Sequence, residues 1–175
     1  MRRQVSSRRV IALPTYDQVS ELPAAREGEV EASFIDENGH MNIGDYFRLT
    51  SHSLWDDTRA AGVEDTYIDD RGLSLFTVEQ HVRYLGEMRL GDRFTVHNRF
   101  IARSGKVVHA IAFLLDQEKQ RLACTMEVSW VHVDMTSRTA TDLPDDIATG
   151  VDALIARTAD LSWPAPVSGV MGVRG

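Results

Sequence analysis

Four long segments with the composition of β-strands follow one another in the second half of this 175-residue chain, separated only by short turns. They span residues 73–85, 92–103, 106–116 and 121–134, and the Ser104–Gly105 pair between the second and third is typical of a hairpin. Consecutive strands joined by hairpins form an antiparallel sheet, and such a sheet needs another element to cover its apolar face. The chain is therefore predicted to be built around an antiparallel sheet.

One long helix precedes these strands and can cover the sheet. Residues 43–62 carry apolar groups at spacings of three and four, and Gly62 supplies a stop. The residues expected on the covered face are Ile43, Tyr46, Phe47, Thr50, Leu54 and Ala61. A sheet wrapped around one central helix is the hotdog arrangement, an α+β fold. The other sheet face then needs cover, for which self-association is the simplest solution.

The remaining segments lie before the long helix, between it and the strands, and after the last strand. Alternation of Val30, Ala32 and Phe34 with polar residues predicts a first strand ending near Ile35. A linker containing Asp69–Gly72 precedes the strands, and residues 144–157 predict a short helix with acidic residues in its first turn. We expect residues 1–27 to form a tail or surface arm, residues 28–157 the hotdog domain, and residues 158–175 a loose tail.

Composition narrows the classes of partner and compartment. A net charge of −7 argues against nucleic acid as the main partner. No apolar run is long enough for a membrane helix, and the basic start lacks the apolar stretch of a secretory signal, so a cytoplasmic location without membrane contact is expected. Cys124 is the only cysteine and lies in an apolar run, which predicts a buried structural thiol and no disulfide.

The loop between the first strand and the long helix carries the chemistry. Asp36 lies in a turn with Gly39, just before the helix start. Free backbone N–H groups at a helix start can stabilise an oxyanion, and a nearby carboxylate can attack a carbonyl or activate a water. Asn38, His40 and Asn42 offer further hydrogen bonds to a substrate. The alternative is that Asp36 or Asn38 only caps the helix and that His40 is a surface residue.

The sequence Asp-x-Asn-Gly-His-Met-Asn from Asp36, with Tyr46 ten residues after the aspartate, resembles the 4-hydroxybenzoyl-CoA thioesterase-like family of hotdog proteins. The resemblance covers residues 30–134 and includes Arg83–Leu85 and Leu90–Asp92. It implies that Asp36 is the nucleophile or general base and that the backbone N–H near Ile43 binds the thioester oxygen. Many relatives carry a second aspartate where this chain has Phe34, which leaves the catalytic position untouched.

Within that family the chain looks most similar to the betainyl-CoA thioesterases of carnitine breakdown. The residues that carry this finer likeness are Asp36–Met41, Phe76–Arg83 and His132–Asp134.

Glu79 and His81 are the next candidates for a catalytic role. They share one strand face with Thr77 and Arg83, while the opposite face is expected to point to the helix and carries Phe76, Val78, Val82 and Tyr84. The polar face could position substrate or water at an interface between two copies, or it could simply be solvated.

A cationic acyl group would be recognised by aromatic ring faces, because the ring quadrupole attracts cations. Candidates are Tyr46, Trp55, Phe76, Tyr84 and Trp130; the alternative, favoured for any single one of them, is that the ring belongs to the core. The phosphates of CoA need basic residues, for which the candidates are Arg83, Arg89, Arg93, Arg99, Arg103 and Lys106. The histidines form no metal-ligand pattern, so no metal is expected.

These observations predict an acyl-CoA thioesterase that needs no organic cofactor and acts on a small acyl-CoA as a homodimer or dimer of dimers. The finer likeness implies that the acyl-CoA is betainyl-CoA. One alternative is a non-catalytic acyl-CoA-binding protein of the same fold. Another is a hotdog hydratase or dehydratase, which is disfavoured because the chain lacks a His-Phe-Pro-type motif.

Overall fold

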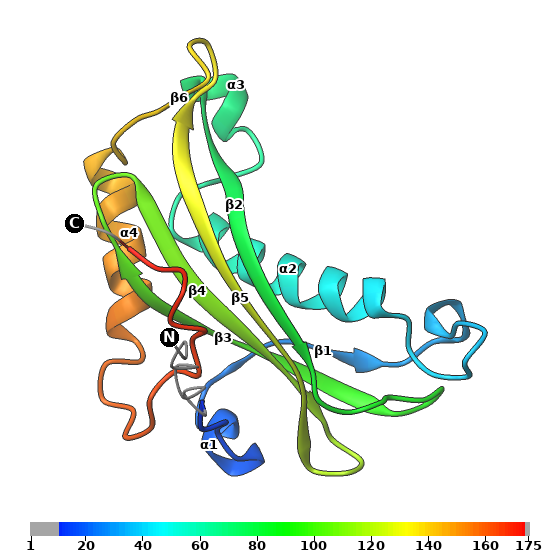
Figure 1. Cartoon of the computed structure of the whole chain (residues 1–175). Coiled ribbons are helices and arrows are strands. Elements are labelled where there is room, and N and C mark those ends of the chain that lie inside the picture. Colours follow the sequence, from blue (N-terminus) through cyan, green and yellow to red (C-terminus); the bar gives the residue numbers. More distant parts are fainter. Residues whose placement is uncertain (1–10, 174–175) are drawn as a thin grey trace, which may run out of the picture.

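The computed structural model describes residues 11–173 and has a strongly curled antiparallel sheet as its framework (Figure 1). The sheet order is β1-β3-β4-β5-β2, with the short β6 paired to β5. The strands are β1 Ala24–Glu29, β2 Leu73–Tyr84, β3 Arg93–Arg103, β4 Val107–Asp116, β5 Arg121–Asp134 and β6 Thr139–Ala140. The four predicted long strands are confirmed, and β2 occupies one edge of the sheet.

Helix α2, Ile43–Ala60, lies across one face of the sheet and packs against β3, β4 and β5 (Figure 1). Its buried residues follow the three- and four-residue spacing of an amphipathic helix: Tyr46, Leu49, Thr50, Ser53, Leu54 and Thr58. The helix was predicted correctly, but two residues were assigned to the wrong face. Ile43 is 60% exposed because it lies at the helix start beside a pocket, and Phe47 is 38% exposed at the border of the buried stripe.

Helix α4, Asp145–Ala156, packs beside α2 and β3 and confirms the predicted second helix. Gly150 permits this close approach, since a Cβ atom there would lie 2.4 Å from the Ala61 carbonyl oxygen. The expected linker before β2 instead contains α3, Tyr67–Arg71, which ends at Gly72 in the left-handed conformation that glycine tolerates.

The first strand lies earlier in the chain than predicted. β1 spans Ala24–Glu29 and pairs with β3, whereas the alternating segment after it forms a short 3₁₀ helix, Ala32–Phe34. The side chains of β1 are mostly exposed, so backbone hydrogen bonds hold this strand and no apolar alternation marks it. The expected tail therefore contains a sheet strand, and α1, Tyr16–Ser20, precedes it. Residues 1–10 of that expected tail lie outside the described part.

The sheet face opposite α2 is covered by both ends of the described chain. Val19 of α1 and Trp163 after α4 pack with Ile111 and Phe113 of β4 in a second apolar cluster. Arg99 donates from Nη1 to the Trp163 carbonyl at 2.8 Å and stacks over the indole ring. Residues 158–173 form no further helix or strand, but they are not the loose tail that was expected. Residues 174–175 of that tail are not described.

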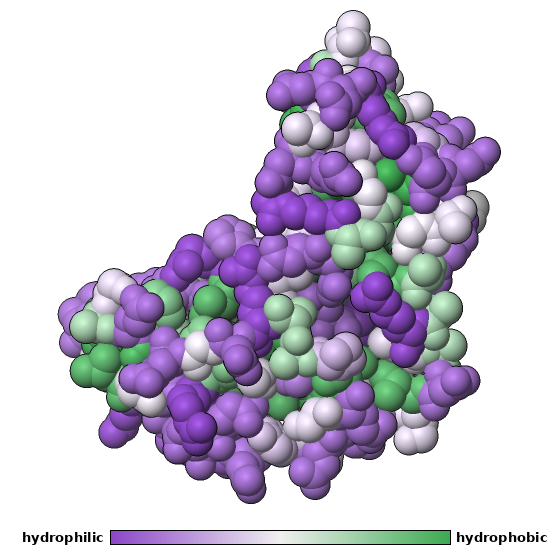
Figure 2. Space-filling model, turned by 180° about the vertical axis from the view of Figure 1, so that it is seen from behind, coloured by the Kyte–Doolittle hydropathy of each residue, from purple (hydrophilic) through white to green (hydrophobic). Residues whose placement is uncertain are grey.

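A β-bulge divides β2. Thr77 pairs with Trp130 of β5 and Glu79 pairs with Ser129, so Val78 is an extra residue in the ladder. Trp130 belongs to the core beneath α2, which places Thr77 on the helix side and Phe76 on the opposite side. The bulge thus reverses the predicted faces of Phe76 and Thr77. Val78 and Tyr84, expected in the core, are 58% and 47% exposed. Seen from behind the view of Figure 1, the molecule has a mostly hydrophilic surface with apolar patches between the polar side chains (Figure 2).

Candidate active site

The loop that precedes α2 folds into a tight turn. The carbonyl oxygen of Asp36 accepts the Gly39 N–H at 3.0 Å, and the Asp36 N–H donates to the carbonyl oxygen of His40 at 3.1 Å. Gly39 has φ +75°, a left-handed conformation that favours glycine. The Met41 N–H donates to the Met88 carbonyl oxygen at 2.8 Å, which fastens the loop to the turn between β2 and β3.

The Asp36 side chain is only 11% exposed and faces polar groups of its own loop. Its Oδ1 accepts the Asn38 N–H at 2.9 Å and lies 3.8 Å from Nδ1 of His40. Its Oδ2 lies 3.5 Å from Nδ2 of Asn42. The loop therefore holds one carboxylate in a fixed orientation beside an imidazole and an amide. Asn38 itself is exposed and contributes only its backbone N–H.

Asn42 is the N-cap of α2. Its Oδ1 accepts the Gly44 N–H at 2.8 Å, and its carbonyl oxygen accepts the N–H of Asp45 at 2.9 Å. The alternative that Asp36 or Asn38 caps the helix is therefore wrong. Among residues 11–173, no acceptor bonds the Ile43 N–H. This N–H lies at the positive end of the helix dipole, the location suited to an oxyanion.

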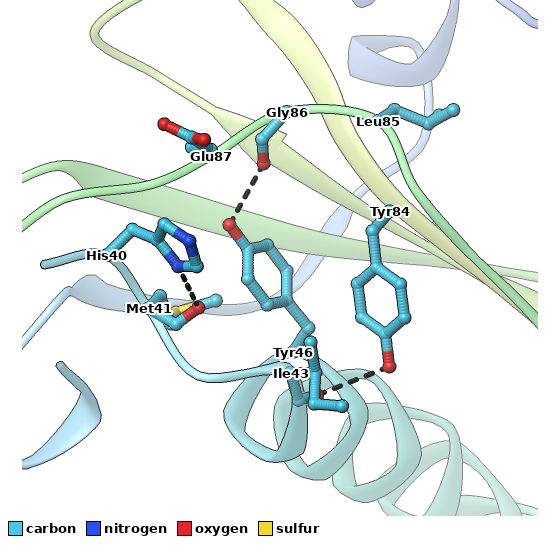
Figure 3. A pocket seen from close by; sticks show the side chains of 8 residues that line it. All are labelled: His40, Met41, Ile43, Tyr46, Tyr84, Leu85, Gly86 and Glu87. Carbon is cyan, nitrogen blue, oxygen red and sulfur yellow. Dashed lines mark hydrogen bonds between the residues drawn. The ribbon is translucent and has the colours of Figure 1, made fainter. Parts of the chain in front are cut away.

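A pocket of about 270 Å³ opens beside the helix start (Figure 3). One wall comes from the loop and α2, and the other from the end of β2 and the turn after it. The lining residues are His40, Met41, Ile43, Tyr46, Tyr84, Leu85, Gly86 and Glu87. Its volume is just below the roughly 300–1,000 Å³ of pockets that hold drug-sized ligands. A small acyl group is the kind of ligand that this space can enclose.

Tyr46 joins the two walls of the pocket. Its hydroxyl donates to the Gly86 carbonyl oxygen at 2.9 Å and accepts the Met88 N–H at 2.8 Å. Burial raises the pKa of Tyr46 to about 12, so the hydroxyl stays protonated near neutral pH. The Tyr84 ring meets the Tyr46 ring edge to face, with centroids 5.6 Å apart and an interplanar angle of 80°. The two rings lie side by side at the pocket (Figure 3), where the exposed Tyr84 ring faces the opening and the buried Tyr46 ring supports it.

Glu79 and His81 do not reach this pocket. They lie on the sheet face opposite α2, because Glu79 pairs with Ser129 and His81 with Glu127. His81 Nδ1 lies 3.8 Å from the carboxylate of Glu127, which is 1% exposed and bonded to His109 Nε2 at 2.9 Å. Within one chain, the structure separates these two candidates from Asp36.

The Glu127 carboxylate also accepts the Ser168 N–H at 2.7 Å. Burial would raise the pKa of Glu127, but the hydrogen bonds from His109 and Ser168 outweigh it and hold the pKa below its usual value. The group therefore remains ionised and fastens the C-terminal segment to the sheet.

The aromatic candidates divide into two groups. Tyr46 and Tyr84 line the pocket, whereas Trp130 is 4% exposed and packs against Phe100 in the core. Trp55 is half-buried against the same core, and Phe76 lies on the opposite sheet face beneath the Arg138 guanidinium. The geometry therefore favours only the two tyrosines as contacts for an acyl group.

The candidate phosphate-binding residues do not form one cluster. Arg93 and Arg103 pair with Glu118 and Asp152, while Arg83 and Arg99 donate to backbone carbonyl oxygens of the C-terminal segment. Arg89 lies 3.9 Å from Glu87, and Lys106 is exposed at the β3–β4 turn.

Cys124 is fully buried, as predicted, and burial raises the pKa of its thiol to about 12. In the described part of the chain, no three His, Cys, Asp or Glu side chains are grouped as metal ligands. No helix in residues 11–173 is long and apolar enough to cross a membrane.

Sequence reasoning missed Leu85, Gly86 and Glu87 as pocket residues. Leu85 ends a predicted strand, Gly86 and Glu87 begin a predicted turn, and the hydrogen bond between Tyr46 and Gly86 links positions 40 residues apart. No local pattern marks such a contact.

Comparison with known proteins places this geometry in a family. Among solved structures, a hypothetical protein from Staphylococcus aureus in complex with CoA superposes with a TM-score of 0.78 at 24% identity, over 87% of this chain and 97% of that one. A 1,4-dihydroxy-2-naphthoyl-CoA thioesterase from Synechocystis gives a TM-score of 0.66 at 16% identity, over 79% and 97%. Residues 30–151 match the model of the thioesterase-like superfamily. The chain belongs to this superfamily.

Membership confirms the hotdog fold and the family resemblance predicted from the Asp36 loop. Among the curated relatives of this chain is the betainyl-CoA thioesterase of Pseudomonas aeruginosa. The two are 26% identical over 156 residues, which is 89% of this chain and 98% of the relative. The L-carnitine dehydrogenase/betainyl-CoA thioesterase of Rhizobium meliloti is 28% identical over 139 residues. The match covers 78% of this chain but only 27% of that longer protein.

Proposed function

We propose that this protein hydrolyses a small acyl-CoA thioester to the free acid and CoA. The proposal rests on three features that lie together at the start of α2. The Asp36 carboxylate is fixed by its own loop, the Ile43 N–H has no acceptor among the described residues, and a pocket adjoins both. The names of the curated relatives support thioester hydrolysis and make the betainyl group the first acyl group to test.

In the proposed reaction, the thioester carbonyl oxygen approaches the Ile43 N–H while the acyl group enters the pocket. Asp36 either attacks the carbonyl carbon itself or removes a proton from a water that attacks it. The negative charge that develops on the carbonyl oxygen is stabilised by the N–H and the helix dipole. Collapse of the tetrahedral intermediate breaks the carbon–sulfur bond and releases CoA as the thiolate, which takes up a proton. If water is the nucleophile, the free acid forms in this step. If Asp36 is the nucleophile, the acyl group remains on its carboxylate as an anhydride, which a water then hydrolyses to the free acid and regenerated Asp36.

The other loop residues have supporting roles in this proposal. His40 lines the pocket; its Nδ1 lies 3.3 Å from the Met41 carbonyl oxygen and 3.8 Å from the Asp36 carboxylate, so its Nε2 is the nitrogen that can hydrogen-bond the substrate. Asn42 orders the helix start and touches the same carboxylate. We also propose that the working unit is a homodimer or a dimer of dimers, supported by the edge position of β2 and the exposed Val78 on it.

The test is release of CoA thiol from a panel of betainyl-CoA, short aliphatic acyl-CoAs and an aromatic acyl-CoA. Asp36→Asn keeps an oxygen acceptor for the Asn38 N–H but loses the charge, and should lower kcat by about 100-fold or more. Asp45→Asn is the matched control, because Asp45 lies in the first turn of α2, pairs with Arg48 and does not line the pocket.

Three outcomes have different meanings. Turnover that collapses in Asp36→Asn but not in Asp45→Asn supports the assignment. Binding of the esters without any hydrolysis favours the non-catalytic acyl-CoA-binding alternative. Full activity in Asp36→Asn refutes Asp36 as the catalytic group and makes Glu79 and His81 the next residues to replace.

A further inference from the structure

The pocket beside the helix start has few free hydrogen-bonding groups. The Tyr46 hydroxyl already donates to Gly86 and accepts from Met88. The Tyr84 hydroxyl is directed to the Ile43 carbonyl oxygen at 3.4 Å. Tyr84, which is 47% exposed, therefore presents its ring surface to a ligand, and Leu85 adds further apolar wall, whereas Tyr46 and Met41 are buried behind that wall.

Two lining side chains keep polar atoms available: the imidazole of His40 beside the Asp36 loop, and Glu87, which is the acidic side chain among the lining residues. Its closest cation is Arg89 at 3.9 Å, and the two side chains are 64% and 71% exposed, so the pair is loose. Arg121 is also near, because its Nη2 donates to the Glu87 carbonyl oxygen. However, the charge of Arg121 is matched by the buried carboxylate of Asp116, which lies 3.2 Å from Nε.

Ring surfaces and one loosely paired carboxylate form a pocket suited to a particular kind of group. A quaternary ammonium is apolar on its surface, needs no hydrogen-bond acceptor, and is attracted both to aromatic faces and to a carboxylate. A primary ammonium would lose its hydrogen bonds to water without finding enough acceptors here, and an anionic acyl group would be repelled by Glu87.

We propose that Glu87 and the ring of Tyr84 determine acyl specificity, by selecting an acyl group that ends in a quaternary ammonium over a neutral group of the same shape. This inference rests on the proposed thioesterase function. Glu87 lies on the turn after β2 and lines the pocket, whereas Glu79 lies on the other sheet face.

The experiment compares two substrates of the same shape, betainyl-CoA and tert-butylacetyl-CoA, in which a carbon replaces the nitrogen. Because the cation also changes the intrinsic reactivity of the thioester, the measured quantity is the change in the ratio of their kcat/KM values between wild type and variants. Glu87→Gln should lower the ratio about 3- to 5-fold, the effect expected of one exposed charge interaction. Added salt should lower the ratio in wild type but not in Glu87→Gln.

Tyr84→Leu removes the ring and should lower the ratio about 3-fold, whereas Tyr84→Phe keeps the ring and should preserve it. Glu64→Gln removes an exposed carboxylate at the far end of α2 and serves as the matched control. Hydrolysis of both substrates with a ratio unchanged in Glu87→Gln, or lowered instead by Glu79→Gln, overturns the inference and leaves the thioesterase function intact. Hydrolysis of neither substrate by wild type overturns both.

Discussion

Replacing Tyr46 with phenylalanine tests how the pocket is held together. The substitution leaves the ring in place and removes only the hydroxyl, which bonds the Gly86 carbonyl oxygen at 2.9 Å and the Met88 N–H at 2.8 Å. Met88 is completely buried, so its N–H loses its partner without access to water, whereas Gly86 is half-buried and its carbonyl can be partly hydrated. One buried unsatisfied group costs about 1–3 kcal/mol. The Gly86 carbonyl oxygen also loses a hydrogen bond, which water replaces in part. Together, the two losses should lower the free energy of unfolding by about 2–4 kcal/mol.

The assay is urea unfolding followed by tryptophan fluorescence, at one protein concentration because self-association shifts apparent stability. With a slope of about 1–3 kcal/mol per molar urea, the midpoint should fall by about 1–2 M. Tyr84→Phe is the matched control. That hydroxyl has one long contact on a ring 47% exposed, so its loss should change stability by no more than about 0.5 kcal/mol. A loss below about 1 kcal/mol in Tyr46→Phe, or equal losses in both variants, would refute the reasoning.

Two further predictions concern pH and assembly. Burial lowers the pKa of His97 and His132 below the ordinary 6.5, so on acidification these two side chains bind protons more readily in the unfolded chain than in the folded one. Stability measured by urea unfolding should therefore be constant between about pH 7 and 8 and fall as the pH drops below about 6.5; a rise on acidification would contradict this. Light scattering should give two or four times the 19.6 kDa chain mass, and a monomer at assay concentration would refute the proposed assembly.

The long strands and the central helix were predictable because their signals are local. Each of the four strands is a run of β-forming residues bounded by turn residues, and α2 has both a repeating apolar stripe and a terminal glycine. β1 was missed for the opposite reason: its side chains are exposed and it exists only because β3 offers an antiparallel partner. The bulge at Val78 also escaped prediction, since pairing with β5 decides it.

The candidate site also has one part with a local sequence signal and one part that depends on contacts between distant residues. The Asp36 loop could be found because a turn, a carboxylate and a helix start occur together within eight residues, and because the pattern resembles a known family. The opposite wall could not be found, since the contact between Tyr46 and Gly86 arises only when the sheet curls around the helix. Glu79 was a candidate from the sequence, but its pairing with Ser129 places it on the sheet face opposite the pocket.

The pocket combines two stretches of chain with different tasks. The Asp36 loop and the start of α2 hold the reactive groups, whereas Tyr84–Glu87 supply the surface that the acyl group meets. Substitutions in the second stretch can therefore alter which thioester is accepted while the carboxylate and the helix N-terminus keep their positions. Such substitutions must preserve the hydrogen bonds that Met88 makes with Met41 and with Tyr46. A change that moves the turn after β2 away from α2 also releases the loop that holds Asp36.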